Sequence, residues 1–132
     1  MKITPDTNVL VRALTEDDAR QSKIAQTELG KAEIVAVALP ALCELVWVLA
    51  RGYKISAVEI ASAIRGLLNS ANVVTNRPAA EAGLAMLDAG GDFADGAIAY
   101  EGNWLGAESF VSFDKKAAKL AESQGLSARL LS

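Results

Sequence analysis

The stretch Met1-Lys2-Ile3-Thr4-Pro5-Asp6-Thr7-Asn8 decides how the chain begins to fold. A short, mostly apolar run ends at Asp6, and apolar residues at helical spacing follow at once (Val9, Leu10, Ala13 and Leu14). The pattern predicts a strand over residues 1–5 and a helix over residues 7–14. Pro5 has no N–H to donate, so it suits the end of that strand. Asp6 therefore marks a strand-to-helix junction, and in open α/β sheets ligands bind beyond the carboxyl ends of strands.

The remaining sequence alternates between strand and helix patterns. Apolar periodicity, Gly and Pro boundaries and capping residues define the elements. The expected helices cover about 19–30, 40–51, 56–68, 76–89, 92–103 and 114–124, and the expected strands cover 33–39, 72–75, 109–113 and 126–131. This order predicts a single domain over residues 1–132, with a mostly parallel sheet flanked by helices.

The composition narrows the chemistry that the chain can perform. Histidine is absent, which excludes histidine-activated nucleophiles, paired-histidine acid–base catalysis and most zinc sites. Carboxylate oxygen remains, and it is the ligand of magnesium, manganese and calcium. The formal net charge of −3 gives no basic footprint for nucleic acid. A nucleic-acid substrate is still possible, because bound cations can offset an acidic pocket.

Other features indicate where the protein works. One cysteine, Cys43, allows no internal disulfide, as expected in a reducing cytoplasm. The longest apolar run, residues 34–50, contains Pro40 and Glu44 and is shorter than the roughly 20 residues that span a bilayer. We find no basic-then-apolar signal at the N-terminus. We therefore expect a cytoplasmic protein without a membrane segment.

Acidic side chains occur at several predicted boundaries. Asp6 and Asp114 follow predicted strands, while Asp92 and Asp95 stand at the start of a predicted helix. Each could simply cap its helix or interact favourably with the helix dipole. The spacing of Asp92 and Asp95 also puts them on one helical face, where they could share a cation. Gly96 is unfavourable inside a helix, which hints at the close approach of another segment.

Glu44 differs from these acids because it lies within the most apolar predicted helix, residues 40–51. That helix is apolar nearly all round, which predicts burial on most faces. A buried carboxylate without a partner is costly or has a strongly raised pKa. Glu44 would then need a cation, a hydrogen-bond donor or water. The alternative is a narrow solvent-facing stripe on which Glu44 pairs with Arg51.

The acids are more informative as a set than singly. The carboxyl ends of parallel strands meet at one rim of a sheet. The acids expected at this rim are Asp6, Glu44, Asp95 and Asp114. Independent helix caps would gather at the same rim. The expected burial of Glu44 and the lack of other catalytic residue types favour a site for a hard divalent cation.

Four segments, in order, carry a family resemblance. They are Asp6-Thr7-Asn8-Val9-Leu10, Glu44 in its apolar helix, Gly91-Asp92-Phe93-Ala94-Asp95-Gly96-Ala97-Ile98-Ala99, and Val111-Ser112-Phe113-Asp114-Lys115-Lys116-Ala117. The chain resembles a PIN domain, and its length and acid spacing resemble the VapC-type toxins of bacterial toxin–antitoxin pairs. The resemblance covers the whole chain. It implies a three-layer α/β/α sandwich with a mostly parallel sheet of four to five strands, and a metal-dependent endoribonuclease.

The resemblance also implies a role for each matching residue. The residues that would carry catalysis and bind Mg²⁺ or Mn²⁺ are Asp6, Glu44, Asp95 and Asp114. Asp92 often accompanies that set, and Asn8 and Ser112 match positions that usually orient its acids. The family commonly has Thr where Ser112 stands, so the hydroxyl is kept, and Ala is frequent where Gly96 stands.

An RNA substrate, a cognate antitoxin and a second copy of the chain are the partners that the resemblance implies. An antitoxin tail would fill an apolar groove and place a basic side chain among the acids. Candidates for that groove are Leu10, Leu14 and the helix over residues 40–50. The sequence alone does not separate such a groove from the core.

RNA binding would need cations near the acids. The basic residues near the expected site are Arg12, Arg51, Lys115 and Lys116. For each of them a solvated surface charge is the more common role. Arg12 is the best candidate for a phosphate contact because it follows Asp6 by six residues on the same predicted helix. The aromatic residues Trp47, Tyr100 and Trp104 could stack on bases. Aromatic side chains on apolar helices are, however, more often in a core or an interface.

Three other functions compete with this interpretation. A phosphoaspartyl phosphatase would use Asp6 as its nucleophile, but Asn8 stands where such enzymes have a second Asp. A phospho-receiver domain would need an Asp at the end of a mid-chain strand, and no Asp occurs between Asp18 and Asp88. A non-catalytic binding module of the same fold is the third alternative, and the intact set of acids argues against it.

Overall fold

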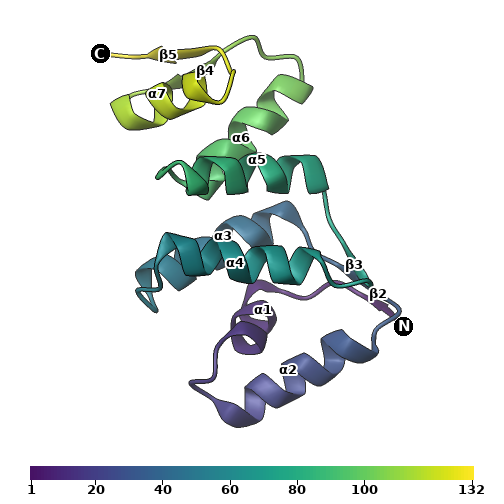
Figure 1. Ribbon diagram of the computed structural model, residues 1–132. Helices are drawn as coiled ribbons and strands as arrows, with labels where there is room; N and C mark the ends of the chain where they lie inside the picture. Colours follow the sequence, from purple (N-terminus) through teal and green to yellow (C-terminus); the bar gives the residue numbers. More distant parts are fainter. The chain divides into compact units, whose positions relative to one another are not determined.

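The structure, a computed structural model, describes residues 1–132 as seven helices and five strands in two compact units, residues 1–76 and 77–132. The first unit contains β1 (Lys2–Ile3), α1 (Thr7–Leu14), α2 (Ala19–Lys31), β2 (Ile34–Ala36), α3 (Leu39–Arg51), α4 (Ala57–Leu68) and β3 (Val73–Val74) (Figure 1). The second contains α5 (Arg77–Asp88), α6 (Phe93–Trp104), β4 (Phe110–Ser112), α7 (Lys115–Ser123) and β5 (Ala128–Leu130). The chain is therefore mostly helical, with short strands.

The sheet of the first unit is parallel and has the order β1-β2-β3. Two threonine hydroxyls prolong its hydrogen bonding. Thr4 Oγ1 donates to the Ala36 carbonyl at 2.7 Å, and Thr75 Oγ1 donates to the Val37 carbonyl at 2.7 Å. Backbone pairing of β1 with β2 ends at Ile3, before Pro5, which has no N–H to donate. The chain then turns into α1 at Asp6.

The core of the first unit comes from one face of each helix. Its fully buried side chains include Leu10, Val35, Leu42, Leu45, Leu49, Ile60 and Ile64. In α3 the buried positions are 42, 45, 46 and 49, which form one stripe at helical spacing. The prediction that α3 is buried on most faces is therefore wrong, because only this stripe meets the core.

Asp17 links two loops of the first unit. Its Oδ2 accepts a 2.7 Å hydrogen bond from the Tyr53 hydroxyl, which lies just after α3. Its Oδ1 accepts from Thr15 Oγ1 at 3.0 Å, and Arg12 Nη1 contacts both oxygens, at 3.1 and 3.2 Å. The Tyr53 hydrogen bond, followed by those of Thr15 and Arg12, lowers the pKa of Asp17 below its ordinary value of 3.8.

Tyr53→Phe is expected to destabilise the protein more at neutral pH than in acid. The pKa of Asp17 is lower in the folded chain than in the unfolded chain. Its interactions therefore contribute stability that is fully present above the unfolded value of 3.8 and is lost as the pH falls through the folded value. Urea unfolding at about pH 7 and about pH 2.5 would measure this difference. Tyr100→Phe is the matched control, and an equal loss at both pH values for Tyr53→Phe would contradict the linkage.

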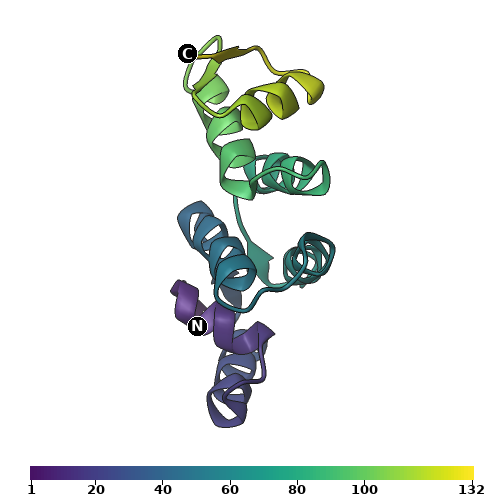
Figure 2. The same ribbon diagram turned by 90° about the vertical axis from the view of Figure 1, so that its left-hand side faces the viewer.

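The second unit is built on close packing between α5 and α6, which both views show as adjacent crossing helices (Figures 1 and 2). A Cβ atom added at Gly96 of α6 would lie 2.4 Å from the Ala82 carbonyl oxygen of α5. One added at Gly83 of α5 would lie 2.7 Å from the Phe93 ring. The close approach expected at Gly96 is therefore confirmed, and the approaching segment is α5. Glycine at these positions sets where the first turn of α6 lies.

The remaining strands form a second parallel sheet. β4 pairs with β5, with Phe110 opposite Ala128 and Ser112 opposite Leu130, and α7 packs beside both strands (Figure 1).

The predicted α/β class and the parallel strands are confirmed. The single sheet of four to five strands is not what the structure contains, because its five strands form a three-stranded and a two-stranded sheet. Each strand is also shorter than predicted, since backbone pairing covers only two or three residues.

Candidate functional site

Three of the predicted acids cap helices. Asp6, Asp92 and Asp114 are the N-cap residues of α1, α6 and α7, and in each the Oδ1 atom accepts a backbone N–H, at 3.0, 2.7 and 3.0 Å. The local sequence explains this, because an Asp between a strand or turn and a helical pattern satisfies a free N–H of the first turn. The capping alternative is thus confirmed for all three. It leaves the Oδ2 atom of each side chain without a hydrogen bond.

Asp95 is the acid that capping does not explain. It lies in the first turn of α6, is half-buried and has neither a hydrogen bond nor an ion pair. Partial removal from water raises its pKa, and the negative charges of Asp92 and Asp114 raise it further. Three carboxylates of the second unit therefore share one electrostatic environment. A cation there would relieve their mutual repulsion.

Glu44 is exposed, not buried as predicted. It lies on the side of α3 opposite the buried stripe, together with Pro40, Trp47 and Arg51, which are also exposed. The apolar composition of the helix led to the wrong prediction for Glu44, because several apolar residues of α3 face outward, including Trp47 at 60% exposure. The solvent-facing stripe is thus the correct alternative, although Glu44 and Arg51 form no salt bridge. Glu44 remains accessible to a cation.

The two residues expected to orient the acids act differently from expectation. Ser112 Oγ accepts the backbone N–H of Asp114 at 2.9 Å, so it fixes the backbone of Asp114 and not a carboxylate. Asn8 is exposed and makes no hydrogen bond to Asp6. It does line the same pocket as Asp6, so it lies near the expected position without orienting the acid.

The first unit contains a pocket of about 620 Å³ between the β1–α1 segment and α2. Three predicted site residues line it, namely Asp6, Asn8 and Arg12, and its apolar wall includes Ile3, Val9 and Ile24. The phosphate contact predicted for Arg12 stays a prediction, and one end of its guanidinium is paired with Asp17. Sequence reasoning missed Asp17, although its place five residues after Arg12 in an acidic turn was a signal.

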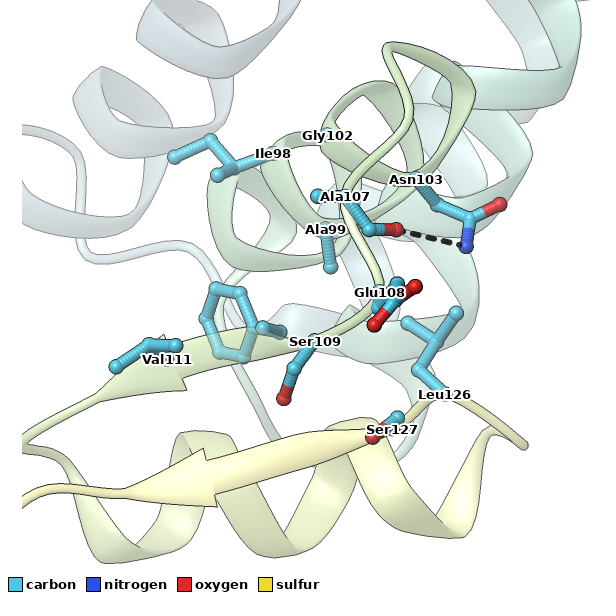
Figure 3. A pocket seen from close by; sticks show the side chains of 11 residues that line it. Ile98, Ala99, Gly102, Asn103, Ala107, Glu108, Ser109, Val111, Leu126 and Ser127 are labelled. Carbon is cyan, nitrogen blue, oxygen red and sulfur yellow. Dashed lines mark hydrogen bonds between the residues drawn. The ribbon is translucent and has the colours of Figure 1, made fainter.

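The second unit contains a smaller pocket of about 250 Å³ between α6 and β4 (Figure 3). Figure 3 shows Ala99 of α6 pointing toward the strand that carries Val111, and a hydrogen bond from Asn103 Nδ2 to the Ala107 carbonyl at 3.5 Å. Ser109 also lines it, and its Oγ is buried without a hydrogen-bond partner. None of the predicted acids lines this pocket. It is therefore separate from the candidate acidic site.

Several other predicted contacts have a different environment from the one expected. Trp47 and Trp104 are 60% and 76% exposed, so neither belongs to the core. Leu10 is fully buried and is a core residue, not part of a groove. The remaining cations near the site are exposed and form no salt bridge, as expected for solvated charges: Arg51, Lys115 and Lys116.

The predicted site residues fall into two groups, one in each unit. Asp6, Asn8 and Arg12 share a pocket of the first unit, which also carries Glu44, and the second unit holds Asp92, Asp95 and Asp114. No three acidic or cysteine side chains form a group that could hold an ion by itself. The convergence of all the acids stays a prediction.

The fold and these side chains define an α/β protein in which two of the candidate acids, Asp6 and Asp114, follow parallel strands within three residues. The PIN domain family matches residues 3–123 of the chain. The chain therefore belongs to the PIN domain family, whose members are generally nucleases and typically depend on a divalent metal ion. No curated protein matches the chain. No helix is both long and apolar enough to cross a bilayer.

Proposed function

We propose that the chain is a Mg²⁺- or Mn²⁺-dependent endoribonuclease and the toxin of a VapC-type toxin–antitoxin pair. Within the structure, the observation that supports this most directly is Asp95. It is a half-buried carboxylate without a partner, and its pKa is raised by burial and by two further carboxylates, Asp92 and Asp114. While these acids are ionised, such an arrangement is unfavourable for folding, and a bound cation would relieve it. Membership in a family of metal-dependent nucleases points to the same chemistry.

We also propose that residues 1–132 form a single PIN domain, as predicted from the sequence. The family match over residues 3–123 includes most of both units and supports this proposal.

The side chains fit a hard divalent cation. Their donors are carboxylate oxygens, which Mg²⁺ and Mn²⁺ prefer, and the chain has no histidine that would favour zinc. The capping acids keep Oδ2 available, and Asp95 and Glu44 have no competing partner. The residues that would hold the ion are Asp6, Glu44, Asp95 and Asp114, and Asp92 is a further candidate. A bound ion would supply a water of lowered pKa and positive charge for the leaving oxygen of the RNA.

Purified protein is expected to cleave single-stranded RNA with Mg²⁺ or Mn²⁺ and to lose this activity in a chelator. Asp6→Asn should abolish cleavage without unfolding the protein, because Asn caps helices as well as Asp does. Asp18→Asn is the matched control, since Asp18 caps α2 in the same way and accepts the Gln21 N–H at 3.0 Å. Full activity in Asp6→Asn, or equal loss in both variants, would contradict the proposal.

The partners remain part of the same proposal. They are a cognate antitoxin and a second copy of the chain, acting in the cytoplasm. Exposed apolar side chains support protein binding, since large ones such as Trp104, at 76% exposure, Leu105, at 70%, and Trp47 are costly to leave in water. Co-expression with a small protein encoded directly upstream, followed by co-purification and inhibition of cleavage, would test the antitoxin.

A further inference from the structure

The guanidinium of Arg12 is held at one end only. Both oxygens of Asp17 lie near its Nη1 atom, at 3.1 and 3.2 Å. Asp17 is itself fixed by the Tyr53 hydroxyl at 2.7 Å and by Thr15 Oγ1 at 3.0 Å. These bonds join α1, the turn before α2 and the loop after α3. Arg12 is therefore part of a network, although Asp17 is largely exposed.

The free edge of the guanidinium is the one suited to a phosphate. Arg12 Nε is buried and has no hydrogen-bond partner, and Nη2 makes no hydrogen bond. The Nε and Nη2 donors lie on the same side of the planar group and form the fork that binds carboxylate or phosphate through two parallel bonds. A buried donor without an acceptor is unfavourable. An anion that reached this edge by displacing the atoms that cover Nε would satisfy it.

The position of Arg12 in the structure favours a phosphate as the anion. Arg12 lines the pocket of about 620 Å³ together with Asp6 and with Asn8, which precedes it by one helical turn on α1. Arg12 is the only basic residue in the pocket wall, which also contains the carboxylates of Asp6 and Glu28. Phosphate bound there would lie beside a proposed metal ligand.

We infer that Asp17, Tyr53 and Thr15 are positioning residues that hold Arg12 with its free edge available for a phosphate of the RNA substrate. This inference rests on the proposed function. It differs from the simpler interpretation in which Asp17 neutralises Arg12 and competes with RNA for it. The two interpretations predict opposite signs for the loss of Asp17, because a competitor's removal would tighten RNA binding.

The test uses the full chain and a short, fluorescently labelled single-stranded RNA. Binding is measured by anisotropy in EDTA over a range of salt concentrations, and cleavage kinetics are measured with Mn²⁺. The variants are Arg12→Ala, Arg12→Lys, Asp17→Asn and Tyr53→Phe, with Arg20→Ala as the control. Arg20 is an exposed arginine of α2 outside the pocket wall. Tyr53→Phe keeps every charge and the shape of the ring, so it remains informative if Asp17→Asn fails to fold.

Arg12→Ala is expected to weaken RNA binding about tenfold and to reduce the slope of log K against log salt by about 0.7, as for one lost phosphate contact on a single strand. Arg12→Lys should not restore the affinity, because lysine lacks the fork. Asp17→Asn and Tyr53→Phe should raise KM several-fold and leave kcat unchanged, and Arg20→Ala should change neither.

Two results would overturn this inference without contradicting the proposed function. One is tighter RNA binding in Asp17→Asn, and the other is unchanged binding in every variant of the network while the wild-type chain binds and cleaves RNA. If the wild-type chain neither binds nor cleaves RNA, the proposed function fails and this inference fails with it.

Discussion

Asp95→Asn is expected to abolish RNA cleavage and at the same time to raise the melting temperature of the metal-free protein. The loss of activity should be about 10²–10³-fold or more, comparable with the removal of one group that stabilises transition-state charge. The gain in stability has a separate cause. Asn removes a carboxylate whose pKa is raised by burial and by the charges of Asp92 and Asp114. The helix dipole favours an acid in the first turn of α6. We expect the burial and the repulsion that raise the pKa of Asp95 to outweigh this effect.

The sign of the pH dependence follows from the same pKa. A raised folded pKa means that ionised Asp95 destabilises the fold above that pKa, and that the penalty disappears as the pH falls and the group takes up a proton. The stability gain of Asp95→Asn should therefore be largest near neutral pH and should shrink in acid. Thermal unfolding at several pH values, with and without Mn²⁺, would measure it.

Glu101→Gln is the matched control for Asp95→Asn, because Glu101 is an exposed acid on the same helix. It should change neither cleavage nor melting temperature appreciably. Mn²⁺ should raise the melting temperature of the wild-type chain more than that of Asp95→Asn. Cleavage retained in Asp95→Asn would remove Asp95 from the proposed site. A lowered melting temperature in that variant would contradict the repulsion described at the start of α6.

Gly96→Ala is expected to destabilise the second unit by about 2 kcal/mol. The added Cβ would lie 2.4 Å from the Ala82 carbonyl oxygen and 2.9 Å from Met86 Cβ. Overpacking of this kind costs about 1–3 kcal/mol and occasionally more, and a backbone oxygen cannot move as a flexible side chain can. The better helix propensity of Ala returns only about 1 kcal/mol. The clash therefore decides the sign, and urea unfolding followed by circular dichroism would measure it.

Gly102→Ala provides the opposite result within the same helix. A Cβ added at Gly102 meets nothing within 4 Å. Because no clash arises, only the higher helix propensity of Ala matters, and this substitution should stabilise α6 by up to about 1 kcal/mol. If both substitutions stabilise the protein, the close contact between α5 and α6 is not the reason for glycine at position 96.

The helices could be predicted from the sequence because their signals are local. Thr7–Leu14 was predicted with the observed bounds, and Ser56, Asp92 and Asp114 cap their helices as the sequence indicates. The strands were predicted in the right places but too long. Strand length depends on pairing with distant segments, such as Ile3 opposite Val35, and no local pattern contains that information.

The candidate site was predicted less completely, for a similar reason. The sequence identified the acids by their positions after strands and turns. It could not show that Glu44 faces outward, because apolar residues such as Trp47 lie on the same exposed side of α3. The sequence also could not show the hydrogen bond from the Tyr53 hydroxyl to Asp17, because the two residues are 36 positions apart in the chain. Such side-chain bonds depend on tertiary packing that composition and periodicity do not describe.

The use of Oδ1 by the three capping aspartates has a consequence for the entropy of ion binding. Asp6, Asp92 and Asp114 lose their rotamer freedom when their helices form, before any ion arrives. If a cation binds these acids as proposed, it would still have to immobilise only Glu44 and Asp95, and a glutamate loses up to about 2 kcal/mol of side-chain entropy on ordering. We therefore expect the ordering of Glu44 to account for much of the side-chain entropy lost on ion binding.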